Sequence, residues 1–282
     1  MIIVMMTVCS RRSRRRAVGA LLRVIACAGA VGTLVPDGAA AQTDYYNTDA
    51  GRPIRIEDAY PVERRAFEVQ LAPLSLERGR GGRYHWGLEP ELAYGVLPRT
   101  HIEIGVPVAY RDGGSGATTA GLAGIDVSLF HNLNTETAIP AFAIALGALL
   151  PAGHLGPERA HGSAKAIVTR TFRWARLHVN GEYTVGDEPS DSESEALPRW
   201  MTGVAIDRTV PLSSFLVTGE LYAEQPAADG AELRWNTGVG VRYQLSPRFN
   251  VDAGLGRRFT GEDQSWRATF GTAFAFGLPW YP

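Results

Sequence analysis

Charged and polar side chains recur at every second position in several segments of this chain. Residues 100–110, for example, place isoleucine and valine on one face and His101 and Glu103 on the other. This period of two is typical of a β-strand whose two faces meet different surroundings. If the apolar face meets lipid, the polar face lines the interior of a barrel, where fixed charges can select ions and polar solutes. The predicted lining residues are Glu89, Glu91, His101, Glu103, Arg173, His178, Glu182, Arg234, Arg242 and Asp252.

The tight turns predict which of these residues face each other. Placing Leu245 opposite Phe249 sets Arg242 opposite Asp252, with both side chains pointing inward. Each such pair has two interpretations, a charge that lines a pore or a cross-strand contact that packs a narrow barrel.

A second turn, taken as the two residues 175–176, fixes another pair of segments. It predicts Arg173 opposite His178 and Thr169 opposite Glu182. The interior would then carry mixed charges of both signs.

Two catalytic or ligand-binding chemistries compete with the lining. His85, Glu89, Glu91, His101 and Glu103 could form a histidine–carboxylate metal site, although a histidine in a barrel wall is more often simply hydrogen-bonded. Ser128 lies near His131, as a lipid-hydrolysing barrel would require, but no third residue is placed to orient the histidine.

Other ligand signals are weak. The acidic stretch 187–195 could attract external Ca²⁺, although such a run is more often only solvated. We find no phosphate-binding loop and no nucleotide fingerprint. The sequence therefore predicts no cofactor, no metal and no enzymatic activity.

The N-terminus carries an export signal. Residues 11–16 hold five arginines, residues 17–35 are mostly small and apolar, and Ala39-Ala40-Ala41 suits cleavage before Gln42. We therefore predict a signal peptide over residues 1–41. A twin-arginine signal at residues 11–12 and a lipoprotein box ending at Cys27 are alternatives, but Arg23 beside that box argues against the second.

The mature chain would contain no cysteine, because Cys9 and Cys27 both lie in the signal. The full chain has 28 basic and 29 acidic residues, which argues against nucleic-acid binding. Residues 42–65 are polar, and we expect a periplasmic lead-in there without a core of its own. Residues 66–282 are the predicted barrel.

Period-2 patterning predicts about twelve strands. Most are 10 to 14 residues long, whereas a soluble strand has ~5–6 residues and a membrane-crossing strand ~9–11. The segments are 66–76, 83–96, 100–110, 119–131, 138–150, 162–174, 177–186, 198–209, 214–225, 232–245, 248–259 and 266–277.

The connections between these segments alternate between short and long. Outer-membrane barrels have short periplasmic turns and longer external loops, so the sequence predicts an all-β, closed antiparallel transmembrane β-barrel with both termini periplasmic. A soluble β-sandwich is the alternative.

Aromatic residues gather at the two ends of the predicted strands, as two membrane-interface girdles would require. Tyr94, Phe130, Trp174, Tyr243 and Phe249 lie beside short turns, and Tyr84, Trp86, Tyr110, Tyr183, Trp235, Phe259 and Trp266 lie beside long loops.

Some residues do not fit this pattern. Proline cannot donate to a strand ladder, yet four prolines fall inside predicted strands. Leu216 and Tyr222 are apolar residues on a face that should be polar. The misplaced prolines are Pro73, Pro90, Pro107 and Pro140.

The signal, the acidic lead-in and the dozen alternating strands resemble outer-membrane transporters of the phenol-degradation meta-pathway type. Residues 87–107 are most similar to the opening hairpin of that family, where an early strand ends in a tight Leu-Pro turn. The resemblance spans residues 67–280 and implies no ligand residue. Barrel chains usually end in an aromatic residue, whereas Pro282 follows Tyr281 here.

We therefore expect a cell outer-membrane channel through which small organic solutes diffuse passively. Its partners would be outer-membrane lipid, the barrel assembly machinery and an unidentified solute. A plugged barrel that serves as an envelope anchor is the first alternative, and an outer-membrane enzyme acting on lipid is the second.

Overall fold

The computed structural model describes residues 47–79, 83–112, 118–186, 197–210, 214–227, 230–261 and 264–277. The predicted signal peptide and the acidic stretch 187–195 lie outside these residues. Among the described residues, no helix has the length and hydropathy needed to cross a membrane.

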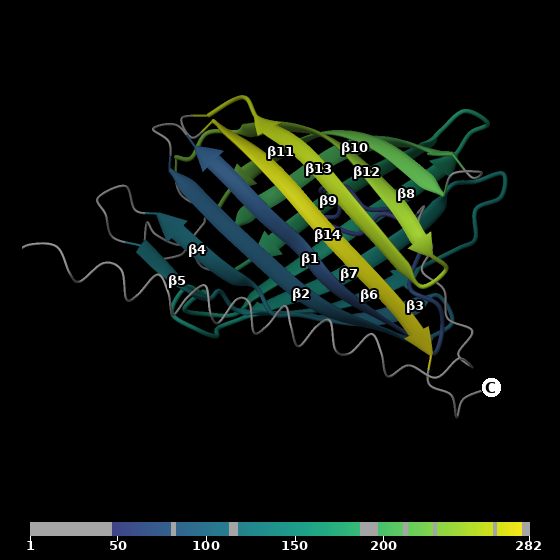
Figure 1. The fold of residues 1–282 in the computed structure, drawn as a ribbon, viewed down its shortest axis with the longest axis horizontal. Coiled ribbons are helices and arrows are strands. Elements are labelled where there is room, and N and C mark those ends of the chain that lie inside the picture. The colour runs from purple at the N-terminus through teal and green to yellow at the C-terminus, as the bar shows by residue number, and fades with distance from the viewer. Residues whose placement is uncertain are drawn as a thin grey trace, which may run out of the picture. The chain divides into compact units, whose positions relative to one another are not determined.

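One antiparallel sheet contains all the described strands (Figure 1). They are β1 (Ala66–Gly79), β2 (Tyr84–Leu97), β3 (Thr100–Gly105), β4 (Val108–Asp112), β5 (Thr118–Leu122), β6 (Ile125–Asn132), β7 (Ala141–Leu150), β8 (His161–Thr171), β9 (Arg176–Val185), β10 (Pro198–Val210), β11 (Phe215–Pro226), β12 (Arg234–Ser246), β13 (Phe249–Arg258) and β14 (Ser265–Gly277).

The sheet closes because β1 pairs with β14 on one side and with β2 on the other. Strand β2 pairs with both β3 and β4, and these pair in turn with β6 and β5. Strands β3 and β4 are therefore one barrel strand with an interruption, and β5 and β6 are another. The result is the predicted closed barrel of 12 strands.

The prolines that conflicted with the strand pattern lie where the ladder is irregular. Pro107 lies between β3 and β4, and Pro140 immediately precedes β7. The β1–β2 register shifts between Leu71 and Leu74, which places Pro73 in a bulge and Pro90 at its edge. Each proline therefore avoids a position where the ladder needs its missing N–H.

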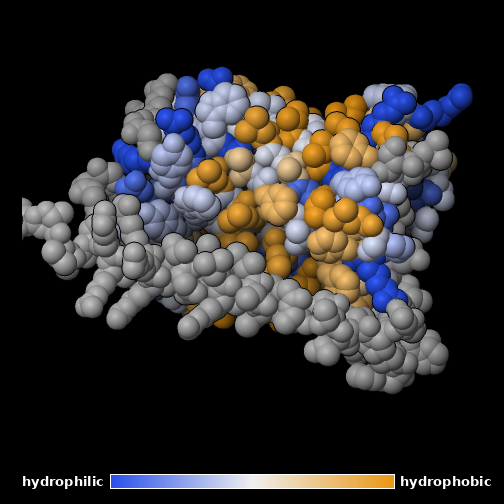
Figure 2. All heavy atoms as spheres, in the orientation of Figure 1, coloured by the Kyte–Doolittle hydropathy of each residue, from blue (hydrophilic) through white to orange (hydrophobic). Residues whose placement is uncertain are grey.

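The strands place apolar side chains outside and polar ones inside. Along β12, Val239, Val241 and Tyr243 are exposed, whereas Asn236 and Arg242 are buried. Figure 2 shows hydrophobic residues over the middle of the visible wall, where β1, β14 and β13 lie. An exposed apolar surface of this extent suits a lipid environment.

The described chain enters and leaves the barrel at one end, because Ala66 lies opposite Gly277. The connection of β2 to β3, at Pro98 and Arg99, lies at this end, as do those of β6 to β7, β8 to β9, β10 to β11 and β12 to β13. We call it the short-turn end. The longer connections lie at the other end, the long-loop end.

The aromatic prediction needs one correction. On the outer face at the short-turn end, the Phe67 ring stacks on Tyr94 at 4.3 Å and on Phe276 at 5.3 Å. Phe130 instead points inward, is 3% exposed and stacks on His101. Alternation along β6 places it there, so it belongs to the interior and not to a girdle.

Candidate functional site: the barrel interior and the segment inside it

Residues 47–62, part of the stretch expected as a periplasmic lead-in, lie against the inner wall of the barrel. Ile56 is fully buried and Arg52 is 1% exposed. We call residues 47–62 the interior segment. Its contacts reach strands around most of the barrel circumference, so these residues are part of the barrel interior and not a separate lead-in that precedes the barrel.

The first anchor of the interior segment is Arg52. Its Nη2 atom donates to Asp252 Oδ2 at 2.9 Å and to Asn250 Oδ1 at 2.9 Å. Arg242 donates from Nη2 to the Arg52 carbonyl at 2.9 Å and pairs with Asp49 at 3.2 Å. The predicted Arg242–Asp252 pair is therefore correct, and the pair holds the segment in place.

The second anchor is a buried cluster around Asp207. Arg176 binds this carboxylate through two nitrogens, at 2.9 and 2.7 Å, and His178 Nε2 lies 2.9 Å from it. Arg176 also pairs with Asp58 of the interior segment at 3.4 Å. Such buried pairs are costly to break, because removing one partner leaves an uncompensated charge.

Asp58 also closes the interior segment into a loop. The Thr48 N–H donates to Asp58 Oδ2 at 3.1 Å, and the Asp58 N–H donates to the Thr48 carbonyl at 3.1 Å. The loop between these residues lies across the interior near the short-turn end, since its anchors Arg176 and Asn250 lie close to short turns.

An apolar contact fixes the middle of the loop. Ile54 and Ile56 form a buried cluster with Met201, Ala205 and Tyr222. This explains why Tyr222 occupies a face that should be polar, since its neighbour is the interior segment and not water. Leu216, the other misfit, is also fully buried on that face.

Backbone N–H groups of the loop donate to wall side chains. Those of Arg55 and Ile56 donate to Glu220 Oε2 at 2.7 and 3.0 Å. The Ala59 N–H donates to Thr169 Oγ1 at 3.0 Å, and the Val62 N–H reaches His101 Nδ1 at 3.0 Å. The wall therefore satisfies an irregular backbone that would otherwise lose hydrogen bonds on burial.

A lysine on β8 joins the loop to the wall. Lys165 Nζ lies 2.6 Å from Glu57 of the interior segment and 3.6 Å from Glu182 on β9. Arg55 Nη2 lies 3.8 Å from Glu182, and its side chain is 35% exposed. Arg55 is thus the most accessible cation that the loop presents to the interior.

The exit of the loop is held at the β6–β7 connection. Tyr60 donates its hydroxyl to Glu136 Oε2 at 3.1 Å. Burial and the Glu136 charge raise the pKa of Tyr60 to about 12, so the hydroxyl remains a donor at neutral pH. Burial opposes ionisation of Glu136, but hydrogen bonds from Thr171 and Tyr60 hold its pKa below the usual value.

Two glycines on the inner face of the wall, Gly240 and Gly254, allow the loop to lie close to the strands. A Cβ at Gly240 would lie 2.6 Å from Pro53 Cγ, and one at Gly254 would lie 2.2 Å from the Pro53 carbonyl oxygen. Both positions are on strands that surround the Arg52 anchor. The sequence pattern had no signal that these glycines accommodate a second layer of chain.

The part of the wall formed by β2, β3 and β6 carries acidic residues. Glu89, Glu91 and Asp126 converge on Gly105, where a Cβ would lie 3.2 Å from Glu89 Oε1 and 3.4 Å from the other two side chains. Glu103 accepts from Ser128 at 3.0 Å and pairs with His101 at 3.2 Å. Among the described residues, Glu89, Glu91 and Asp126 form no ion pair, so no basic side chain lies at contact distance from these acidic groups.

The predicted lining residues are placed as follows, with Arg173 the exception. Glu89, Glu91, His101 and Glu103 lie on one wall; His178 and Glu182 lie on β9; Arg234, Arg242 and Asp252 lie on β12 and β13, all on inward-facing positions. Asp126, Lys165 and Arg267 also face inward and were missed, although alternation within their strands could have found them.

Arg173 lies outside the interior, in the turn between β8 and β9, and is exposed. The turn spans four residues, closed by the Phe172 N–H donating to the Ala175 carbonyl, instead of two. The register therefore pairs Thr169 with His178 and Lys165 with Glu182. The predicted partners Arg173–His178 and Thr169–Glu182 were wrong.

The described residues do not form either of the two alternative sites, the lipid-hydrolysing site or the metal site. Ser128 points inward to Glu103, whereas His131 lies on the outward register of β6 and contacts Thr100 at 2.8 Å. No group of three or more His, Cys, Asp or Glu residues that could hold a metal occurs in the described ranges.

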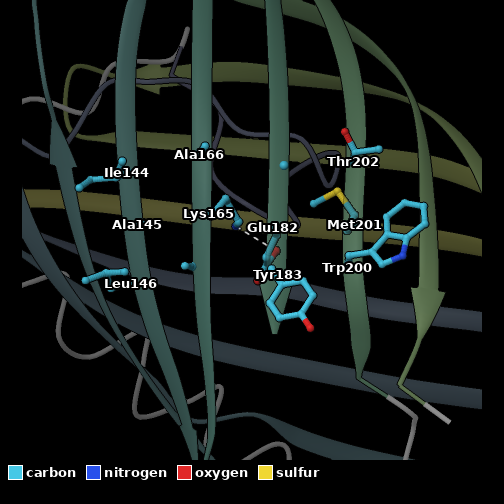
Figure 3. A pocket seen from close by; sticks show the side chains of 12 residues that line it. Ile144, Ala145, Leu146, Lys165, Ala166, Glu182, Tyr183, Trp200, Met201 and Thr202 are labelled. Carbon is cyan, nitrogen blue, oxygen red and sulfur yellow. Dashed lines mark ion pairs between the residues drawn. The ribbon is translucent and has the colours of Figure 1, made fainter. Parts of the chain in front are cut away.

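A shallow groove of about 490 Å³ lies on the outer wall, over β7 to β10 (Figure 3). Ile144, Leu146 and Tyr183 stand beside small residues at Ala164 and Gly181. In Figure 3, Lys165 and Glu182 form their ion pair in the same region of the wall. The groove faces the lipid side, so we do not include it in the interior site.

The barrel fold is similar to that of a solved outer-membrane channel. A channel from Pseudomonas putida F1 aligns with a TM-score of 0.54 at 13% identity, covering 81% of this chain and 100% of that one. The KdgM porin aligns with a TM-score of 0.46 at 11% identity, covering 75% and 99%. The CymD monoaromatic hydrocarbon channel gives 0.42 at 9%, covering 77% and 89%. No curated protein matches the chain significantly.

The closed barrel, its apolar exterior and the first of these likenesses define an outer-membrane β-barrel protein. A family model described as "Putative MetA-pathway of phenol degradation" matches residues 82–276. Because the match covers more than half of the chain, the protein belongs to that family, which confirms the resemblance in its sequence.

Proposed function

We propose that this protein is a passive channel for small organic solutes, and that the interior segment controls how far its lumen is open. The observation that carries the proposal is the way the segment is held. Among the described residues, the hydrogen bonds from residues 47–62 to the wall all involve a side chain. The segment can therefore move without unpairing any barrel strand.

The charged interior supports a channel for polar or ionic groups and predicts its selectivity. The acidic wall formed by Glu89, Glu91 and Asp126 raises the local concentration of cations. Glu91 and Asp126 lie on residues that are paired in the ladder on both sides, so their carboxylates are held at a fixed position, whereas Glu89 lies at the irregularity beside Pro90.

We expect the double substitution Glu89→Gln and Glu91→Gln to weaken a cation preference. Removing two negative charges from the lining lowers the attraction for cations and leaves the wall shape unchanged. The measurement is the reversal potential of the full mature protein in a planar bilayer under a salt gradient. The matched control is Glu158→Gln, an exposed carboxylate in the β7–β8 connection. An unchanged reversal potential in the double variant would refute the lining role.

A plugged barrel acting as an envelope anchor is the second candidate, because the interior segment is bound at several points. It predicts no ion conductance even when the segment is displaced. Outer-membrane lipid is the surrounding partner in both cases, and we expect the barrel assembly machinery to insert the chain.

A further inference from the structure

Two arginines point outward from the barrel wall at the long-loop end. Arg78, near the end of β1, and Arg257, near the end of β13, are both exposed. Their neighbours Glu77 and Arg258 face inward, where Arg258 Nη1 lies 3.4 Å from Glu77 Oε1. Alternation along both strands therefore fixes Arg78 and Arg257 on the outer face.

The two arginines belong to one row that crosses four adjacent strands. Arg78 lies opposite Trp266 on one side and opposite Tyr84 on the other. Trp266 lies opposite Arg257 in turn. The row therefore reads Tyr84, Arg78, Trp266, Arg257, and the two arginine backbones are separated by about 10 Å, two strand spacings.

Aromatic rings position both guanidinium groups. Arg257 Cζ lies 5.1 Å from the centre of the Trp266 ring, and Arg78 Cζ lies 5.6 Å from that of Tyr84. A guanidinium stacked on a ring keeps its N–H edge free for an oxyanion. Figure 2 shows hydrophilic residues at the end of the visible face where β1 finishes and β14 begins.

Neither arginine has a protein anion to neutralise it within the described ranges. Arg78 and Arg257 make no hydrogen bond or ion pair with a described residue. A cation on the lipid face is costly at mid-membrane and costs little near the interface. The exposed aromatics Trp266, Tyr84 and Trp86 mark this level as an interface.

We propose that Arg78 and Arg257 bind a phosphate on the sugar head group of an outer-leaflet glycolipid, of the lipid A kind. Two guanidiniums flanking one aromatic ring match a phosphate with several acceptor oxygens, and the Trp266 ring offers an apolar face to the sugar. The outer leaflet follows from the long loops, which face outward in barrels of this type. The proposal needs a membrane-embedded barrel and is independent of the channel function.

The test is native mass spectrometry of the full mature protein in detergent with added lipid A. We expect the wild-type protein to retain lipid A. The double variant Arg78→Gln and Arg257→Gln should lose at least about tenfold in affinity, because both charge-assisted contacts are removed. The matched control is Arg208→Gln. Arg208 is an outward-facing arginine on β10 near the short-turn end of the barrel, and this variant should bind lipid A as the wild-type protein does.

The lipid itself supplies the second comparison. Lipid A without its phosphates should bind the wild-type protein as weakly as lipid A binds the double variant. Equal binding of phosphorylated and dephosphorylated lipid A, or unchanged binding by the double variant, would overturn the proposal. Equal binding of phosphatidylglycerol would also overturn it, because the site would then be a general anionic-lipid contact. A preserved heat-dependent gel shift would show that the variants are folded.

Discussion

Liposomes that contain the Gly240→Val variant should swell at least about twofold faster in small sugars than liposomes with the wild-type protein. Gly240 faces inward on β12, and a Cβ there would lie 2.6 Å from the Pro53 ring. The strand is held by ladders to β11 and β13, whereas the interior segment is held by side chains. The segment should therefore give way and leave a wider passage.

The matched control for that variant is Gly181→Val. Gly181 lies on β9, and a Cβ at this position would have no atom within 4 Å. This change adds the same side chain without touching the interior segment, so the swelling rate should equal that of the wild type. Equal rates for both variants and wild type, with folded protein on gels, would show that the segment does not limit passage.

Asp207→Ala should lower the free energy of unfolding by about 3–5 kcal/mol. The carboxylate is fully buried and accepts hydrogen bonds from Arg176 at 2.9 and 2.7 Å. It also lies 2.9 Å from His178. Its loss leaves the Arg176 guanidinium without its bidentate partner, and Asp58 alone at 3.4 Å does not replace it.

Urea unfolding of the protein in lipid vesicles measures this effect. Arg208→Ala, on the next residue but on the outer face, should change stability by no more than ~0.5 kcal/mol. A loss below about 1 kcal/mol for Asp207→Ala would mean that the cluster is not a stabilising anchor.

The barrel itself could be predicted from the sequence because its determinants are local. A strand with lipid on one face and polar surroundings on the other must alternate, and its length must suit the membrane. Arg242 was correctly placed opposite Asp252, although the turn closes differently from the prediction. Phe249 pairs with Ser246 and not with Leu245, and the bulge between Gln244 and Ser246 restores the predicted register at Arg242.

The Arg173 error shows the limit of the same method. A turn of four residues instead of two shifts every cross-strand partner, and residues 172–175 carry no signal that distinguishes the two lengths. The face on which a side chain lies and the residue opposite to it are therefore separate predictions. The identity of the opposite residue depends wholly on the length of the turn.

The interior segment could not be predicted, because residues 47–62 have neither strand nor helix periodicity. Their position depends on contacts distant in sequence, such as Arg52 with Asp252. A signal did exist in Leu216 and Tyr222, since apolar residues on a polar face require an apolar neighbour. That neighbour was Ile54 or Ile56 for Tyr222, and nothing local pointed to either.

Planar-bilayer conductance of the wild-type protein and the Gly240→Val variant is the most direct test of the central claim. Discrete conductance steps in the wild type, and larger steps in the variant, are the predicted result. Heat-dependent gel mobility would show in each case that the barrel is folded. No steps from either folded protein would contradict the channel and would favour a closed barrel with a structural role.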